Sequence, residues 1–297
     1  MSTPKAAPTL PVTVLVPTFN RSGYLAEALQ SLLEQDQCAA EIIVIDDGSE
    51  DDTAEVVQRF GSAVRYLRQE NSGKSAALKH GLGHAIGEFV WIFDDDDIAA
   101  PDALSTLHAA LAADPDAGFS YGLCDKFYGE WPGAVTEPNI SYASRDPRAL
   151  YVRLLEDFFI WQGAMLVRRR CYDAVGPFDI RMARSQDYEM NLRLARQFVG
   201  VGVPKVVFHQ RHHAGVRGPR NAAVKADGVE AAWKKYNQII FSEVHASHAL
   251  AEFFIEADDS AGALAERRHA TALMQRACIM GRKGLWDRAI ADFEATA

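Results

Sequence analysis

Cysteine is scarce in this chain of 297 residues, and the four that occur are widely separated: Cys38, Cys124, Cys171 and Cys278. No two of them form a Cys-x-x-Cys pair. This spacing disfavours a zinc site built on paired thiols, and it disfavours the disulfide framework of a small secreted domain. We therefore expect reduced thiols and a cytoplasmic protein.

Positive charge is also in short supply, with 31 Lys plus Arg against 40 Asp plus Glu and a formal net charge of -9. A protein that binds nucleic acid through many phosphate contacts needs the opposite balance, so we expect no nucleic-acid partner. No apolar run approaches the length of a transmembrane helix, and residues 1–11 contain no apolar signal segment. We expect residues 1–10 to form a disordered leader and any attachment to the inner face of a membrane to be peripheral.

The glycine-rich G-x-G-x-x-G turn that binds dinucleotides is missing after the first apolar segment, Val12 to Val16. Its absence disfavours a dehydrogenase. The remaining composition, 48% hydrophobic and 24% charged, is typical of a globular protein. The length allows one large α/β domain and a smaller appendage.

Apolar segments rich in β-branched residues alternate with amphipathic segments in the first third of the chain. The strand-like segments are 12–16, 41–45, 64–67 and 89–93, and the helix-like segments are 24–33, 53–60 and 75–85. This alternation predicts an α/β fold with a Rossmann-like, mostly parallel central sheet flanked by helices. Further strands are expected at 118–124, 164–167 and 206–208, and further helices at 101–112, 147–157 and 187–197.

The rest of the chain reads as helical, so we predict a main domain over 11–218 and a C-terminal helical extension over 219–297. Its last segment, 277–295, resembles part of a tetratricopeptide hairpin. One such unit cannot bury its own apolar face. An ordinary helical cap on the main domain is therefore the alternative, and both stay open.

Polar residues follow the first two predicted strands, at the edge where open parallel sheets bind ligands. Pro17 should end the first strand, and Thr18 and Asn20 then offer polar groups to a ligand. Asp47 follows the second strand beside Gly48, which permits close backbone approach. Its carboxylate could accept hydrogen bonds from a base or ribose, or it could belong to a helix cap.

The third predicted strand is followed by Gly73 and Lys74, which open a helix. Free backbone amides at a helix N-terminus, together with a lysine ammonium, predict a cradle for a diphosphate. A solvated lysine is the alternative.

Four consecutive carboxylates, Asp94 to Asp97, follow the fourth strand. At the edge of a low-dielectric core their repulsion would raise their pKa values unless a cation compensates it, and hard divalent ions prefer oxygen ligands. We predict a Mg²⁺ or Mn²⁺ site whose purpose is to activate a departing diphosphate. An acidic loop without metal is the alternative.

Two later segments could complete a catalytic site. Asp187 opens an amphipathic helix and could act as a general base, although an aspartate there also stabilises the helix dipole. Arg211 and His213 follow the strand at 206–208. Arginine can pair with phosphate, and imidazole can ligate Mn²⁺.

In this order, the residues resemble those of the family 2 glycosyltransferases. The resemblance covers about residues 11–215 and rests on VLVPTFN at 14–20, IDDGS at 45–49, NSG at 71–73, FDDDD at 93–97, GPFD at 176–179 and QD at 186–187. It implies a GT-A fold and a nucleotide-sugar donor, with UDP favoured over TDP. It also implies an inverting mechanism, in which an aspartate base assists one direct displacement of a metal-bound nucleoside diphosphate.

The resemblance also implies roles for single residues on the donor side. Thr18 and Asp47 would hold the nucleoside, with Pro17, Asn20, Gly73, Lys74 and Asp94 beside them. Asp95 would contact the ribose region, Asp96 would bind the metal, and Arg211 would lie near phosphate.

On the other side of the reaction, Asp187 would be the base and His213 a metal or phosphate contact. Trp161 and Gln162 fall where the acceptor is expected, and Trp161 could stack on a sugar ring. Gln186 stands where the family usually has an acidic residue, which should leave the pKa of Asp187 lower.

The predicted function is transfer of a single sugar from a nucleotide sugar to an acceptor hydroxyl, in the synthesis of a bacterial surface glycan or glycoconjugate. The QxxRW element of processive synthases is absent after Asp187, and the acceptor could be a glycan, a lipid-linked sugar or a protein. Two alternatives remain. A sugar-1-phosphate nucleotidyltransferase would need a GxGTR loop that the chain lacks, and a non-catalytic carbohydrate-binding scaffold would not need the acidic residues. The oligomeric state is left open.

Overall fold

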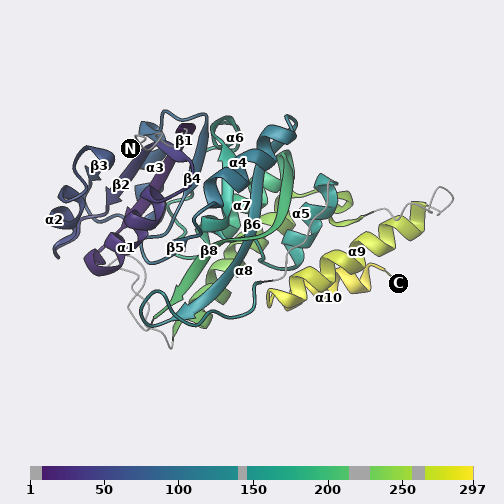
Figure 1. Cartoon of the computed structure of the whole chain (residues 1–297). Helices are drawn as coiled ribbons and strands as arrows, with labels where there is room; N and C mark the ends of the chain where they lie inside the picture. Colours follow the sequence, from purple (N-terminus) through teal and green to yellow (C-terminus); the bar gives the residue numbers. More distant parts are fainter. Residues whose placement is uncertain (1–8, 140–145, 214–227, 256–264, 297) are drawn as a thin grey trace.

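The computed structural model describes residues 9–139, 146–213, 228–255 and 265–296. Its centre is one curled sheet of eight strands in the order β3-β2-β1-β4-β7-β6-β8-β5 (Figure 1). The strands are β1 Thr9–Thr18, β2 Cys38–Asp46, β3 Arg65–Arg68, β4 Phe89–Ile92, β5 Ile98–Ala99, β6 Ala117–Tyr128, β7 Met165–Arg168 and β8 Val199–His212. The α/β prediction is confirmed.

Helices cover both faces of this sheet, and the last ones lie beyond it at the edge of the molecule. They are α1 Ser22–Leu33, α2 Thr53–Gln58, α3 Lys74–His84, α4 Ala103–Ala113, α5 Pro147–Glu156, α6 Arg169–Val175, α7 Gln186–Gln197, α8 Val229–Ser247, α9 Ala265–Arg282 and α10 Trp286–Glu294. Short 3-10 turns include η2 Gln162–Ala164.

Strand direction changes across the sheet. β1 pairs in parallel with β2 and β4, β3 pairs in parallel with β2, and β6 pairs in parallel with β8. β7 runs antiparallel to both β4 and β6, and β5 runs antiparallel to β8. The sheet is therefore parallel in its first half and mixed beyond β4, a distinction that an apolar segment does not encode.

Alternation along the strands divides the core into two layers. Val14 and Val16 face one side of the sheet, where they pack with the apolar residues of α1, α2 and α4. Leu15, between them, faces the other side with residues of α3, α5 and α7. Side chains of a strand point to opposite faces in turn, so a sheet covered on both sides needs apolar residues at every position.

Pro17 does not end β1, contrary to our prediction, because its register continues through Pro17 and Thr18 against β2. Leu15 accepts a hydrogen bond from Phe93 on the β4 side, and Thr18 accepts one from Asp47 on the β2 side. The backbone polar groups of Pro17, two positions after Leu15, point toward the β4 side, where β4 has already ended at Ile92. The missing N–H of Pro17 therefore costs no ladder bond.

The structure describes the first predicted boundary of the main domain, at residues 10 and 11, but not the second. β1 already begins at Thr9, so Thr9 and Leu10 belong to the sheet rather than to the leader. Residues 1–8 and the boundary near Gly218 lie outside the described residues.

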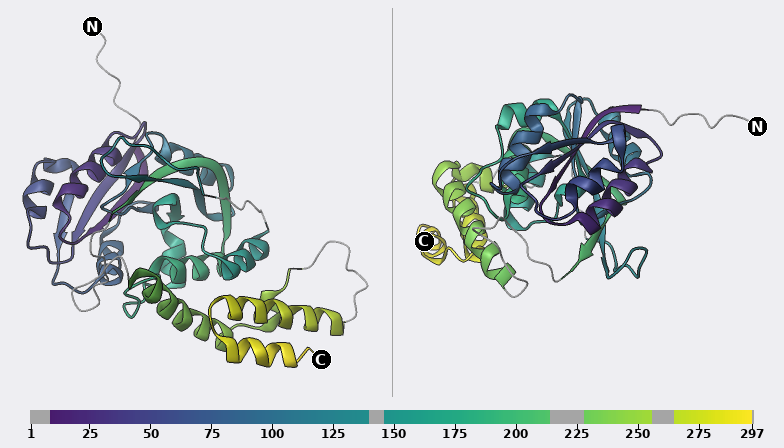
Figure 2. Two further views of the ribbon diagram at one scale, coloured as in Figure 1. Left: turned by 90° about the horizontal axis from the view of Figure 1, so that it is seen from below. Right: turned by 90° about the vertical axis from the view of Figure 1, so that its left-hand side faces the viewer.

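The C-terminal helices pack against the same apolar layer as α3, α5 and α7, through residues such as Phe241 and Met280. α9 and α10 lie side by side at the edge of the molecule (Figure 2), and Arg276 and Asp292 form an ion pair between them. Among the described residues, none of the helices is both long and apolar enough to cross a membrane.

Candidate active site

A cleft lies at the carboxyl ends of β1, β2 and β4. Most of the residues predicted from sequence line it: Pro17, Thr18, Asp47, Gly73, Lys74, Asp94, Asp95, Asp96, Trp161, Gln162 and Asp187. They come from segments far apart in the chain. Because β1, β2 and β4 run in parallel, the residues that follow these strands meet at one edge of the sheet.

Asp47 organises the turn between β3 and α3. Its carboxylate accepts hydrogen bonds from the backbone N–H of Ser72 at 2.9 Å and of Gly73 at 2.7 Å. Gly48 has a φ of 82°, and a Cβ there would lie 3.0 Å from the Asn71 nitrogen, so glycine is needed at this position. The amides of Ser72 and Gly73, which directly precede α3, are thus bound to Asp47, and the diphosphate cradle at the start of α3 stays a prediction.

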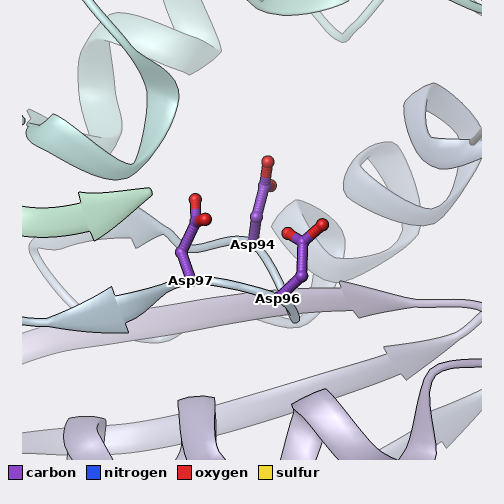
Figure 3. A group of neighbouring side chains, drawn as sticks. All are labelled: Asp94, Asp96 and Asp97. Atoms are coloured by element: carbon purple, nitrogen blue, oxygen red, sulfur yellow. The ribbon is translucent and has the colours of Figure 1, made fainter. Parts of the chain in front are cut away.

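Three carboxylates of the loop after β4, those of Asp94, Asp96 and Asp97, point to the same side (Figure 3). Each offers one oxygen, and these oxygens lie within 4.8 Å of one another. Burial, together with the Asp96 and Asp94 carboxylates, raises the pKa of Asp97 well above its ordinary value. An all-oxygen cluster with this concentration of negative charge fits a hard divalent cation. Asp97 belongs to the acidic run in which a metal site was predicted, although the family resemblance assigned the metal to Asp96 alone of these carboxylates.

Arg21 is a site residue that the sequence reasoning missed. Its Nη1 atom lies 2.9 Å from Oδ1 of Asp95 and 2.8 Å from Oδ2 of Asp96. Burial opposes its charge, but the two carboxylates raise the pKa of Arg21. Its position directly after Asn20, at the end of the first strand, was the available signal.

Lys74 and Asp187 both line the cleft and interact electrostatically. Nζ of Lys74 lies 2.5 Å from Oδ1 of Asp94. Burial lowers the pKa of Lys74, but Asp94 and Asp187 raise it above its ordinary value. Burial raises the pKa of Asp187, while Lys74 acts in the opposite direction. The comparison with an acidic residue at position 186, which should raise this pKa further than Gln186 does, stays a prediction.

Arg211 and Asn20 are not among the described residues that line the cleft. Arg211 is only 2% exposed, and its guanidinium donates to the backbone oxygen of Asp96 and to Glu27. Arg211 thus holds the backbone of the acidic loop, and its side chain does not line the cleft. The predicted contact of Arg211 with phosphate is corrected accordingly. Asn20 accepts from the Glu50 N–H at 2.7 Å and so joins two loops.

His213 lies next to the predicted metal ligand rather than on the lining of the cleft. Its Nε2 atom is 2.8 Å from Oδ2 of Asp96, and its ring packs 5.1 Å from that of Tyr24. The imidazole could therefore ligate a cation bound by Asp96 or hold that carboxylate in place.

The lining of the cleft includes the aromatic residue Trp161. The ring of Trp161 packs edge-on against Phe158 at 4.9 Å, and Nζ of Lys126 lies 5.9 Å from its centre. The lining residues that were not predicted also include Lys126, Arg184, Gln210, His212 and Trp233. They lie on β6, β8, α8 and the segment before α7. These elements are far apart in the sequence, and only the pairing of β6 with β8 and the packing of the C-terminal helices bring them together.

A family model described as Glycosyl transferase family 2 matches residues 13–176. Among curated proteins, Glycosyltransferase GlyG of Streptococcus pneumoniae is 39% identical over 101 residues, which are 33% of this chain and 34% of the relative. The GalNAc(5)-diNAcBac-PP-undecaprenol beta-1,3-glucosyltransferase of Campylobacter jejuni is 44% identical over 101 residues, 32% of this chain and 33% of the relative. The chain therefore spans about a third of the length of these relatives.

Solved structures share the fold over almost the whole chain. S. aureus TarS 1-349 in complex with UDP-GlcNAc has a TM-score of 0.64 and 16% identity, and the alignment covers 96% of this chain and 88% of that one. The mannosyltransferase PcManGT from Pyrobaculum calidifontis, in complex with GDP-Man and Mn2+, has a TM-score of 0.56 and 21% identity, covering 99% and 79%. These structures confirm the predicted GT-A architecture. Because the family model matches more than half of its residues, the chain belongs to glycosyl transferase family 2.

Proposed function

We propose that this protein is an inverting glycosyltransferase that moves a single sugar from a UDP-sugar to an acceptor hydroxyl with the help of Mn²⁺ or Mg²⁺. The observation that carries the proposal is the arrangement of Asp94, Lys74 and Asp187. An acidic cluster suited to a metal and a half-buried carboxylate suited to a base line one cleft, and the ammonium of Lys74 interacts electrostatically with Asp94 and Asp187.

Each group has a chemical task in a direct displacement. Asp187 takes the proton from the acceptor hydroxyl, whose oxygen then attacks the anomeric carbon. Asp94, Asp96 and Asp97 would hold the metal ion, which supplies positive charge to the departing diphosphate. Lys74 and Arg21 line the same part of the cleft and add positive charge there.

The support for UDP comes from fold neighbours and is therefore indirect. TarS 1-349 is solved with UDP-GlcNAc and with UDP, whereas PcManGT is solved with GDP-Man and Mn2+. The C. jejuni relative is named for an undecaprenol-linked oligosaccharide. We accordingly propose a bacterial surface glycan or glycoconjugate as the setting, with residues 11–218 as the catalytic domain and 219–297 as a helical extension.

Calorimetric titration with UDP, TDP, GDP and CDP, each with Mn²⁺ and with EDTA, tests the proposal. We expect one nucleotide, UDP, to bind in the micromolar range only with Mn²⁺. The variant Asp96→Ala should lose this metal-dependent binding. Asp173→Ala, at an exposed position on α6, is the matched control and should bind normally. Binding of none of the four nucleotides would favour a non-catalytic scaffold instead.

A further inference from the structure

We propose that Trp233, together with Trp161 and Gln162, forms a subsite for a sugar ring of the acceptor, so that the natural acceptor is a glycan or a glycoconjugate with an exposed terminal sugar. The inference rests on the proposed function, because it takes Asp187 as the group that faces the acceptor. It assigns to the C-terminal region a direct part in substrate selection.

Trp233 reaches the cleft from outside the segment that matches the family model. It lies in the first half of α8, and 45% of its surface is exposed. A large apolar side chain that lines a polar cleft and stays partly exposed is available for contact with a ligand.

The course of α8 puts Trp233 on the side of the base. Farther along this helix, the ring of Phe241 packs 5.6 Å from the ring of Tyr188, which is the neighbour of Asp187. Glu243 of α8 also lies 3.0 Å from Arg181, on the segment that leads into α7. α8 is therefore fixed against the base helix. In a direct displacement the acceptor lies beside the base and opposite the leaving diphosphate.

Trp161 is held in place by a continuous line of aromatic contacts. Phe158 packs against Trp161 at 4.9 Å and against Tyr188 at 5.2 Å, and Tyr188 in turn contacts Phe241. The same aromatic cluster thus fixes Trp161 and anchors the helix that carries Trp233. A rigid platform of this kind loses little conformational entropy when a ligand stacks on it.

Gln162 supplies the polar part of the subsite. The residue is 7% exposed and lines the cleft, and its Oε1 atom has no hydrogen-bond partner in the described part of the chain. A buried acceptor without a donor is unfavourable, so this oxygen is suited to receive a hydrogen bond from a ligand.

Aromatic faces and a buried amide oxygen match the chemistry of a sugar. A pyranose ring presents apolar C–H groups on its face and hydroxyl donors at its rim, and aromatic side chains combined with a few oriented polar groups satisfy both. A free serine or threonine hydroxyl would use neither indole ring. We therefore favour a sugar over a peptide or an isolated lipid phosphate.

Saturation-transfer NMR on the full chain, loaded with UDP and Mn²⁺, tests the subsite. The probes are methyl glycosides of glucose, galactose, mannose, N-acetylglucosamine and N-acetylgalactosamine, with a serine-containing peptide and farnesyl phosphate as competing acceptor classes. At least one glycoside should bind. Trp233→Ala should weaken it about tenfold, and Trp233→Phe should retain part of the affinity.

Trp286→Ala is the matched control, since Trp286 is 63% exposed on α10 and should not affect glycoside binding. UDP affinity should be equal in all variants. Binding of none of the glycosides, glycoside binding that Trp233→Ala leaves unchanged, or binding of the peptide or farnesyl phosphate alone would overturn the subsite. Glycoside binding that depends on Trp233 in an enzyme that never binds UDP would support the subsite and contradict the proposed function.

Discussion

Nη1 of Arg21 lies 2.8 Å from Oδ2 of Asp96, the carboxylate that the family resemblance assigns to the metal. The guanidinium is therefore a built-in counter-charge for the acidic loop. A metal ion that binds Asp96 would share its carboxylate with Arg21, so the arginine limits repulsion in the loop before metal and donor arrive.

Replacing Arg21 by Met should destabilise the metal-free protein. The side chains of Arg21 and Asp96 are 20% and 8% exposed, and removal of one partner from a buried ion pair costs about 3 kcal/mol. Thermal unfolding of Arg21→Met should show a lower Tm, and Mn²⁺ should raise that Tm more than it raises the wild-type value. Arg59→Met, at an exposed arginine, serves as control. Equal Mn²⁺ effects on both proteins would show that Arg21 does not compensate this charge.

The proposed role of Asp187 as the base predicts the acid side of the pH profile. A base must be ionised, and burial raises the pKa of Asp187, so kcat should fall on acidification at a higher pH than an ordinary aspartate would give. Lys74 acts to lower this pKa. In Lys74→Met the acid limb should therefore move to still higher pH, as measured by initial rates across the acidic range. An unmoved limb would mean that another group controls it.

Lys283 should make stability depend on pH in the alkaline range. Burial lowers its pKa from 10.5 to about 8, while its ammonium donates to the Glu156 backbone oxygen and to Tyr188 Oη. Between about 8 and 10.5 the unfolded chain binds this proton and the folded chain does not, so this group's contribution to stability rises with pH.

Chemical unfolding of Lys283→Met and wild type over this interval isolates the effect, because other titrating groups cancel in the difference. The stability advantage of wild type over the variant should grow as pH rises. A constant difference would contradict the lowered pKa.

Asp47 should matter for folding as well as for the donor. Its carboxylate accepts from Ser72, Gly73, Gln69 and Asn71 at 2.7 to 3.1 Å. Asp47→Ala leaves these donors without their acceptor and should lower the free energy of unfolding by about 3 kcal/mol. Asp47→Asn keeps one oxygen and should lose less. Asp52→Ala is the control in urea unfolding, since Asp52 makes no side-chain cap to α2. A loss no larger in Asp47→Ala than in this control would limit Asp47 to ligand binding.

The sequence allowed prediction of residues whose position follows from local pattern. Asp94 to Asp97 follow a fully buried strand, and Asp187 lies in the first turn of an amphipathic helix, so both could be placed at the sheet edge. The reverse direction of β7 could not be predicted, because an apolar strand buried on both faces looks alike in either direction.

Other site residues depend on long-range packing and gave no local signal. Trp233 lines the cleft on α8, a helix that Phe241 anchors on Tyr188, far away in the sequence. Arg211 showed the opposite error. Its position after the strand at 206–208 and the family resemblance indicated a phosphate contact, but its side chain turns into the protein and packs between Tyr24 and Phe127.

The central claim, that Asp187 is the base of a metal-dependent transfer, is tested most directly by Asp187→Asn. The amide keeps the size of the side chain but cannot accept the proton. The substrate for the assay is the UDP-sugar that the wild-type protein consumes fastest, and its turnover should fall by about 10²- to 10⁴-fold in the variant. UDP titrated calorimetrically with Mn²⁺ should bind the variant as tightly as wild type. Near-normal turnover with intact UDP binding would contradict the account and require a different base.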